Sequence, residues 1–142
     1  MATKPWHIPL RLASGAFILQ QGVAKQSADE GTAQWLQSRA ALVNPKFAEM
    51  DPRTFALLLS TSEIALGTAL LAIGFVPPLL AGAGLTAFGA LLNTLYLRAE
   101  GTTKEGSIVP TQQGVPLAKD VWLTAIGSAL VLDSIFAPRR RR

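Results

Sequence analysis

Two long apolar runs dominate the pattern of hydrophobic and polar positions along the chain. They extend from Thr54 to Val76 and from Pro78 to Leu97, and Glu63 is the only charged residue in either. Each run has about the 20 residues that an α-helix needs to cross a hydrocarbon core roughly 30 Å thick. Two successive helices with no polar face would have no surface to present to water. The pattern therefore predicts a transmembrane helical hairpin.

A further apolar segment lies on each side of this hairpin. The first runs from Ile8 to Ala24, and the last runs from Val121 to Ala137 after a helix start at Pro116. We predict four transmembrane helices, at about residues 8–25, 53–76, 78–98 and 117–137. No internal repeat is visible among these four segments. The segment 99–115 is predicted to be a polar loop because Gly, Pro, Thr and Gln are frequent in it.

The first of these helices is more polar than the others, and its basic flank resembles that of a signal peptide. The sequence after Gln20 and Gln21 has no small-x-small cleavage site, so we expect the segment to be retained. Gly15 and Gly22 are seven residues apart and lie near one face, where they allow another helix to approach closely. We predict a protein-facing transmembrane helix.

Between the first two crossings, the segment 33–43 has the pattern of a short amphipathic helix. Thr32 is its predicted N-cap, and Asn44 and Pro45 end it. It either lies in the headgroup plane with Trp35 as an anchor or caps the helix bundle, and the two interpretations are compatible. The predicted fold is all-α: one membrane domain, residues 1–142, in which a four-helix bundle carries this amphipathic segment.

The composition agrees with a membrane protein and limits the chemistry of the chain. Only 15% of the 142 residues are charged, and the mean hydropathy is +0.32; charged residues supply about a quarter of an ordinary soluble domain. The absence of cysteine excludes thiol and iron–sulfur chemistry, and a lone histidine argues against a zinc or haem site. We expect no catalytic residue, metal ligand or cofactor on this chain, with a quinone as the one alternative.

The net charge of +4 arises mainly at the C-terminus, where Arg139, Arg140, Arg141 and Arg142 form a basic tail. Beside a membrane helix, such a tail is more typical of contact with anionic lipids than of nucleic-acid binding. Four crossings place both termini on one side, and the basic tail with Lys4 and Arg11 indicates that this side is cytoplasmic. The expected location is the plasma membrane.

All four predicted crossings carry polar residues near the end opposite the termini. These residues are Gln21, Lys25, Glu63, Asn93, Lys119 and Asp120. Glu63 lies roughly 13 Å inside its helix, at 1.5 Å per residue, where a carboxylate is costly unless it is paired or protonated. The cluster either lines a polar cavity for a quinone, a lipid headgroup or a proton relay, or holds the bundle together. We favour the second interpretation, with Lys25 as the partner of Glu63 and Lys119 as the second choice.

Several short motifs resemble those of the DoxX-like family of membrane proteins. They are Arg11-Leu12 followed by Gly15, Phe17 and Gly22-x-x-Lys25; Glu63 with Gly67, Leu70 and Gly74; and Leu117-Ala-Lys-Asp with Gly127 and Leu130. The resemblance covers most of the chain and excludes the arginine tail and the Trp35 segment. It implies a small four-helix bundle associated with membrane redox assemblies. The absence of cysteine departs from the requirements of a self-sufficient sulfur oxidoreductase.

Together, these features predict a non-catalytic subunit or accessory factor of a larger, redox-related membrane complex, with the bilayer and other membrane subunits as partners. One alternative is a quinone-reactive subunit of the thiosulfate:quinone oxidoreductase type. A lipid or small-solute transporter is the third possibility, and the lack of a visible repeat argues against it.

Overall fold

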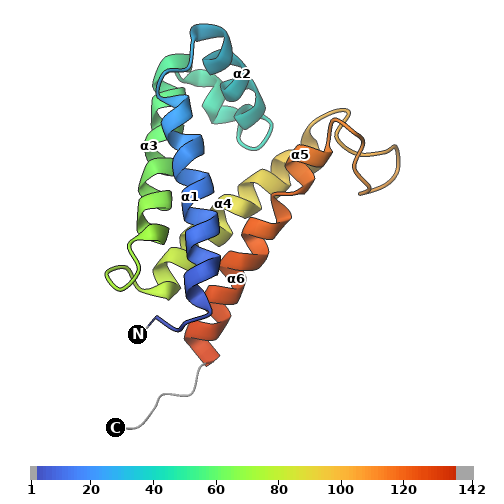
Figure 1. The fold of residues 1–142 in the computed structure, drawn as a ribbon. Coiled ribbons are helices and arrows are strands. Elements are labelled where there is room, and N and C mark those ends of the chain that lie inside the picture. Colours follow the sequence, from blue (N-terminus) through green and yellow to red (C-terminus); the bar gives the residue numbers. More distant parts are fainter. Residues whose placement is uncertain (1–2, 137–142) are drawn as a thin grey trace, which may run out of the picture.

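The fold, which a computed structural model describes for residues 3–136, is all-helical (Figure 1). Its helices are α1 (His7–Lys25), α2 (Glu30–Ala41), the 3₁₀ helix η1 (Pro45–Glu49), α3 (Pro52–Leu71), α4 (Pro78–Arg98), α5 (Val115–Ala118) and α6 (Val121–Phe136). Within residues 3–136 there is no β-strand, and one isolated bridge joins Thr103 to Pro110. The predicted all-α class is confirmed. The basic tail, residues 139–142, lies outside the described residues.

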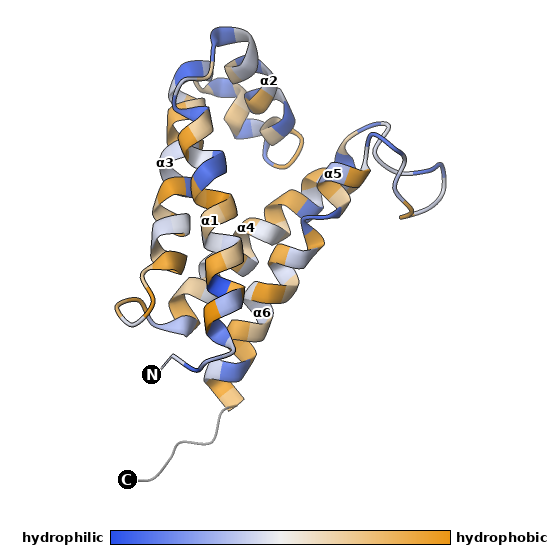
Figure 2. Ribbon diagram, viewed as in Figure 1, coloured by the Kyte–Doolittle hydropathy of each residue, from blue (hydrophilic) through white to orange (hydrophobic). Residues whose placement is uncertain are grey.

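Three helical segments are long and apolar enough to cross a membrane: Pro52–Leu71, Pro78–Arg98 and Val115–Phe136. Figure 2 shows apolar residues along α3, α4 and α6, whereas polar residues gather on α2 and on the loop before α5. These observations support a membrane protein. Helix α1 does not meet the same criteria of length and composition, so the fourth crossing is not shown by them and stays a prediction.

The four long helices form two closely packed pairs rather than one uniform bundle. Helix α1 packs along α3, and α4 packs along α6. The pairs approach each other near the end that carries His7 and Phe136, here called the terminal end (Figure 1). They diverge toward the opposite end, which carries α2 and residues 99–114 and is here called the loop end. The buried apolar core consists of Ile18, Leu70, Ala81, Leu85, Leu123 and Leu130.

Glycines bring the two backbones of each pair into direct contact. They are Gly15, Gly22 and Gly67 in the first pair and Gly82, Gly89 and Gly127 in the second. A Cβ atom at Gly67 would lie 2.6 Å from the backbone nitrogen of Leu19, and one at Gly127 would lie 2.5 Å from that of Thr86. Both distances are well below van der Waals contact, so a side chain at either position would force the helices apart.

These contacts reveal an internal repeat, in which the first pair corresponds to the second. Gly15 packs on Leu70 and Gly67 in the same way that Gly82 packs on Leu130 and Gly127. The segments 65–71 (ALGTALL) and 125–131 (AIGSALV) are identical at four of seven positions. The expectation of no internal repeat is therefore wrong. The sequence match is short, and it is the glycine contacts that extend the correspondence along both helices.

The second predicted crossing ends earlier than expected. Helix α3 stops at Leu71 instead of residue 76, and Gly74 then adopts a φ of 94°, which favours glycine. The guanidinium of Arg11 donates to carbonyl oxygens of the last turn, so the helix can end there without leaving them unpaired. The fourth predicted crossing, 117–137, is likewise interrupted between α5 and α6. The predicted bounds of α1 and α4 agree with the structure to within one residue.

Helix α2 begins earlier than predicted because Asp29, rather than Thr32, is its N-cap. The Asp29 carboxylate accepts a hydrogen bond of 2.7 Å from the backbone N–H of Thr32, which lowers the pKa of Asp29 below its ordinary value. The inner face of α2 carries Ala33 and Gln37, and the Gln37 amide donates to the carbonyl of Phe47 at 2.8 Å. Trp35 is 56% exposed. One face of α2 thus packs on the protein, while Trp35, the predicted membrane anchor, is exposed.

The glycine contacts make a direct prediction about stability. Replacing Gly67 or Gly127 by alanine should lower the free energy of unfolding by about 1–3 kcal/mol, because each methyl group meets backbone atoms that cannot move aside. Thermal unfolding in detergent measures the effect. Gly31→Ala in α2 is the control, since its nearest atom would be 3.7 Å away and alanine favours a helix. Equal losses at all three positions would contradict the close packing.

Candidate functional site

The charged residues of α1, together with His7 and Ser14, lie on one face that is mostly buried, whereas Gln20 is exposed. This face carries His7, Arg11, Ser14, Ile18, Gly22 and Lys25, spaced three or four residues apart. This spacing follows one side of an α-helix. The opposite side exposes large apolar residues such as Leu12, Phe17 and Val23. The charged groups of α1 are therefore directed toward the protein, as predicted, and its lipid-compatible residues are directed outward.

At the loop end of this face, Lys25 and Glu63 form an ion pair. The Lys25 Nζ lies 2.8 Å from Glu63 Oε2 and 3.1 Å from Oε1. The Glu63 side chain is only 5% exposed and that of Lys25 is 18% exposed. One turn nearer the start of α3, the Ser60 hydroxyl donates to the carbonyl of Gly22 at 2.7 Å. The predicted partner of Glu63 is confirmed, and the pair joins α1 to α3.

The other members of the predicted polar cluster do not converge on this pair. Asn93 donates to the hydroxyl of Thr124 at 2.8 Å and so joins α4 to α6. The amide of Gln21 donates to that of Gln20 at 3.0 Å. Lys119 is exposed, and within residues 3–136 neither it nor Asp120 forms an ion pair. The expectation of one cluster assumed a uniform bundle, whereas the two pairs diverge at the loop end.

A second charged cluster, at the terminal end, was not predicted. The Asp133 carboxylate lies 2.7 Å from Lys4 Nζ and 2.8 Å from His7 Nε2, and His7 is almost fully buried. His7 Nδ1 accepts from the backbone N–H of Lys4 at 3.3 Å, which leaves Nε2 to carry the proton directed at Asp133. The contact joins α1 to α6 and hence the two pairs. His7 and Asp133 are 126 residues apart, so no local spacing reveals it.

Arg11 lies between the two charged clusters and is fully buried, and among residues 3–136 no acidic side chain pairs with it. Its Nε donates to the carbonyl of Leu70 at 2.8 Å, and its Nη1 donates to that of Val76 at 2.9 Å. Carbonyl groups at a helix C-terminus carry partial negative charge, so the end of α3 can accommodate a cation. In the described part of the chain every fully buried side-chain polar atom has a hydrogen-bond partner. Arg11 is thus the C-terminal cap of α3.

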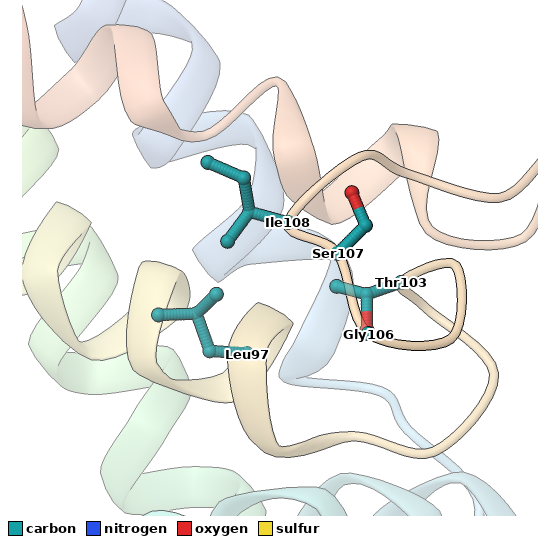
Figure 3. Close-up of a pocket in the computed structure, with 5 residues that line it drawn as sticks. All are labelled: Leu97, Thr103, Gly106, Ser107 and Ile108. Atoms are coloured by element: carbon teal, nitrogen blue, oxygen red, sulfur yellow. The ribbon is translucent and has the colours of Figure 1, made fainter.

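The geometry offers structural roles for these groups more readily than a reaction site. Among residues 3–136 no group of three His, Cys, Asp or Glu side chains lies close enough together to hold a metal ion. One surface depression is lined by Ala16, Leu19, Gln20, Val23, Ala24 and Leu71. Another lies beside the loop before α5 (Figure 3). Neither borders Lys25 or Glu63, the centre of the predicted polar cavity.

The buried ion pair predicts strong energetic coupling between Lys25 and Glu63. Lys25→Met or Glu63→Gln alone should cost about 3–5 kcal/mol, because each leaves one charge buried without its partner. The double variant should cost much less than the sum, as thermal unfolding of the four proteins would show. Lys119→Met is the control and should change little. Additive losses would mean that the two charges do not interact.

The cluster at the terminal end predicts a weaker, salt-sensitive coupling. The side chains of Lys4 and Asp133 are each 28% exposed, so their interaction is partly screened by water. Lys4→Met and Asp133→Asn should show a coupling energy of about 0.2–1 kcal/mol at low salt that declines at 1 M salt. Lys104→Met combined with Asp133→Asn is the control cycle. A coupling that salt does not reduce would contradict this contact.

Comparisons with known proteins add no family assignment to this geometry. No family model, no curated protein and no solved structure matches the chain. The resemblance to DoxX-like proteins therefore rests on the quoted sequence motifs alone and stays a prediction.

Proposed function

We propose that this chain is a small DoxX-like membrane protein that serves as a non-catalytic subunit or accessory factor of a larger, redox-related membrane complex. The observation that carries the proposal is the use of its charged groups inside the fold. Lys25 and Glu63 hold α1 to α3, Arg11 caps α3, and Asp133 holds α6 to α1. Charged groups engaged in this way specify how helices associate.

The same contacts argue against Glu63 as a reacting group. Both oxygens of its carboxylate accept hydrogen bonds from Lys25, and the side chain is buried. A carboxyl group that donates protons to a quinone as it is reduced, or accepts them from a quinol as it is oxidised, must come within hydrogen-bond distance of it or be joined to it by one water molecule. The redox association of the proposal comes from the family resemblance.

The proposed topology has four crossings, with α1 as the fourth membrane helix beside the three apolar ones. The mostly buried face that carries the charges makes this possible, since the surface of α1 left for lipid is apolar apart from Gln20 and the half-buried Gln21. Both termini are proposed to lie in the cytoplasm, and Arg139, Arg140, Arg141 and Arg142 would contact anionic lipids of the plasma membrane.

The proposal predicts a stable partner in the native membrane. The tagged full-length chain, solubilised in mild detergent, should purify with at least one membrane protein in stoichiometric amount, which mass spectrometry would identify. The Gly31→Ala variant should retain the partner, because the substitution lies on an exposed position of α2. A chain that migrates alone under all mild conditions would refute the accessory role.

The same preparation distinguishes the two rival functions. Reduction of a soluble quinone by thiosulfate in the presence of the isolated chain, lost in Glu63→Gln and retained in Ser62→Ala, would establish a quinone-reactive subunit. Ser62 is a suitable control because it is exposed and its hydroxyl bonds within its own helix. The repeat of two helix pairs in the same orientation is also found in some transporters. Solute uptake or lipid transfer by the chain in liposomes would favour that class.

A further inference from the structure

The segment between α4 and α5 is a built loop rather than the open polar connection expected from its composition. The backbone N–H of Lys104 donates to the carbonyl of Val109 at 2.8 Å, beside the bridge between Thr103 and Pro110. From α4, the hydroxyl of the buried Tyr96 donates to the carbonyl of Ile108 at 2.7 Å. These bonds hold the tip of the loop against the end of α4.

The tip presents apolar side chains to the outside. Ile108 is 77% exposed and Val109 is 47% exposed, whereas buried Thr102 anchors the base of the loop. Figure 3 shows Ile108 beside Leu97 of α4, with Thr103, Gly106 and Ser107 completing a shallow depression. Leu97 is itself 59% exposed. An ordered loop therefore adds two aliphatic residues to the exposed apolar surface at the end of α4.

The position of this surface indicates what covers it. Leu97 belongs to the apolar segment Pro78–Arg98, and the exposed Leu80 and Leu91 precede it on the same helix. The patch thus lies at the end of the helix that is apolar enough to face lipid. Exposed aliphatic groups are unfavourable in water, and contiguous ones usually mark a contact surface.

An independent observation places the membrane boundary at the same level. Asn93 bonds to Thr124, and α4 and α6 run in opposite directions, so the start of α6 lies beside the last turn of α4. Trp122, in the first turn of α6, is 72% exposed. Tryptophan is enriched where the hydrocarbon core meets the headgroups.

We propose that the tip of this loop inserts into the bilayer interface, with Ile108 and Val109 beside Leu97 at the boundary between headgroups and acyl chains. The occupant of the patch is the phospholipid bilayer itself. Lys104 and Glu105, on the turn before Ile108, are exposed and would face the aqueous side of the inserted tip. The inference rests on the membrane embedding of the proposed function and not on the accessory role.

The chain contains no cysteine, so single nitroxide labels can be placed without altering it otherwise. Labels at Ile108→Cys, Glu105→Cys and Leu91→Cys in phosphatidylcholine–phosphatidylglycerol bilayers would be compared by their collisions with oxygen, which concentrates in lipid, and with a water-soluble nickel chelate. The ratio of oxygen to nickel accessibility at Ile108 should be several-fold higher than at Glu105 and should approach that at Leu91.

The labels at the three positions distinguish the insertion of the loop tip from the membrane embedding of the chain. A ratio at Ile108 equal to that at Glu105, with Leu91 in lipid, would overturn the insertion of the loop and leave the membrane embedding intact. A water-exposed label at Leu91 would refute the membrane embedding itself. A label at Ile108 that neither reagent reaches would also overturn the proposal, since it would mean that protein covers the tip.

Discussion

The interaction on which the rest of this structure depends is the pairing of charged groups on one face of α1. A helix that carries Arg11 and Lys25 can lie in an apolar environment only if the protein supplies partners for both. Glu63 supplies one partner and the carbonyl groups at the end of α3 supply the other. Helix α3 ends where the Arg11 guanidinium donates hydrogen bonds to the carbonyls of its last turn, so the end of α3 meets this requirement.

Close approach of the helices makes these contacts possible. Gly22 lets α1 lie against α3 at Ile64 and Glu63, so the lysine one turn further can reach the carboxylate. The second pair repeats the glycine contacts with an uncharged polar link, Asn93 to Thr124, near the corresponding position. The same glycine-mediated packing thus occurs in both helix pairs. Among residues 3–136, the α1–α3 pair alone also buries an ion pair.

Much of this arrangement could be predicted from the residues themselves. The apolar runs identify α3 and α4 because no soluble surface could be made from them. Lys25 and Glu63 could be paired in advance, since Glu63 is the one charged residue in the apolar run from Thr54 to Val76 and Lys25 lies one turn beyond Gly22, where the first helix can approach closely. The cluster of Lys4, His7 and Asp133 could not, because it depends on which helices are neighbours in space. For the same reason Lys119 and Asp120 were wrongly assigned to the site of Glu63.

The remaining differences concern loops, where local composition says little about direction. Residues 99–115 are rich in polar and turn-forming types, yet hydrogen bonds from Tyr96 and Lys104 turn Ile108 outward at the end of α4. Asp29 likewise is the N-cap of α2, because it lies three residues before Thr32 and its carboxylate accepts a hydrogen bond from the backbone N–H of Thr32. The outward position of Ile108 and the N-cap at Asp29 both depend on hydrogen bonds that involve the backbone, and the pattern of hydrophobic positions does not predict such bonds.

The sidedness of the two ends of α1 tests the proposal that this helix crosses the membrane despite its charges. Single cysteines at Thr3, before α1, and at Ser38, exposed on α2, can be treated on intact cells with an impermeant maleimide. With both termini in the cytoplasm, Ser38→Cys should react, and Thr3→Cys should react only after permeabilisation. The reverse pattern would keep the crossing and invert the orientation. Equal reactivity of both positions on intact cells would contradict the crossing of α1.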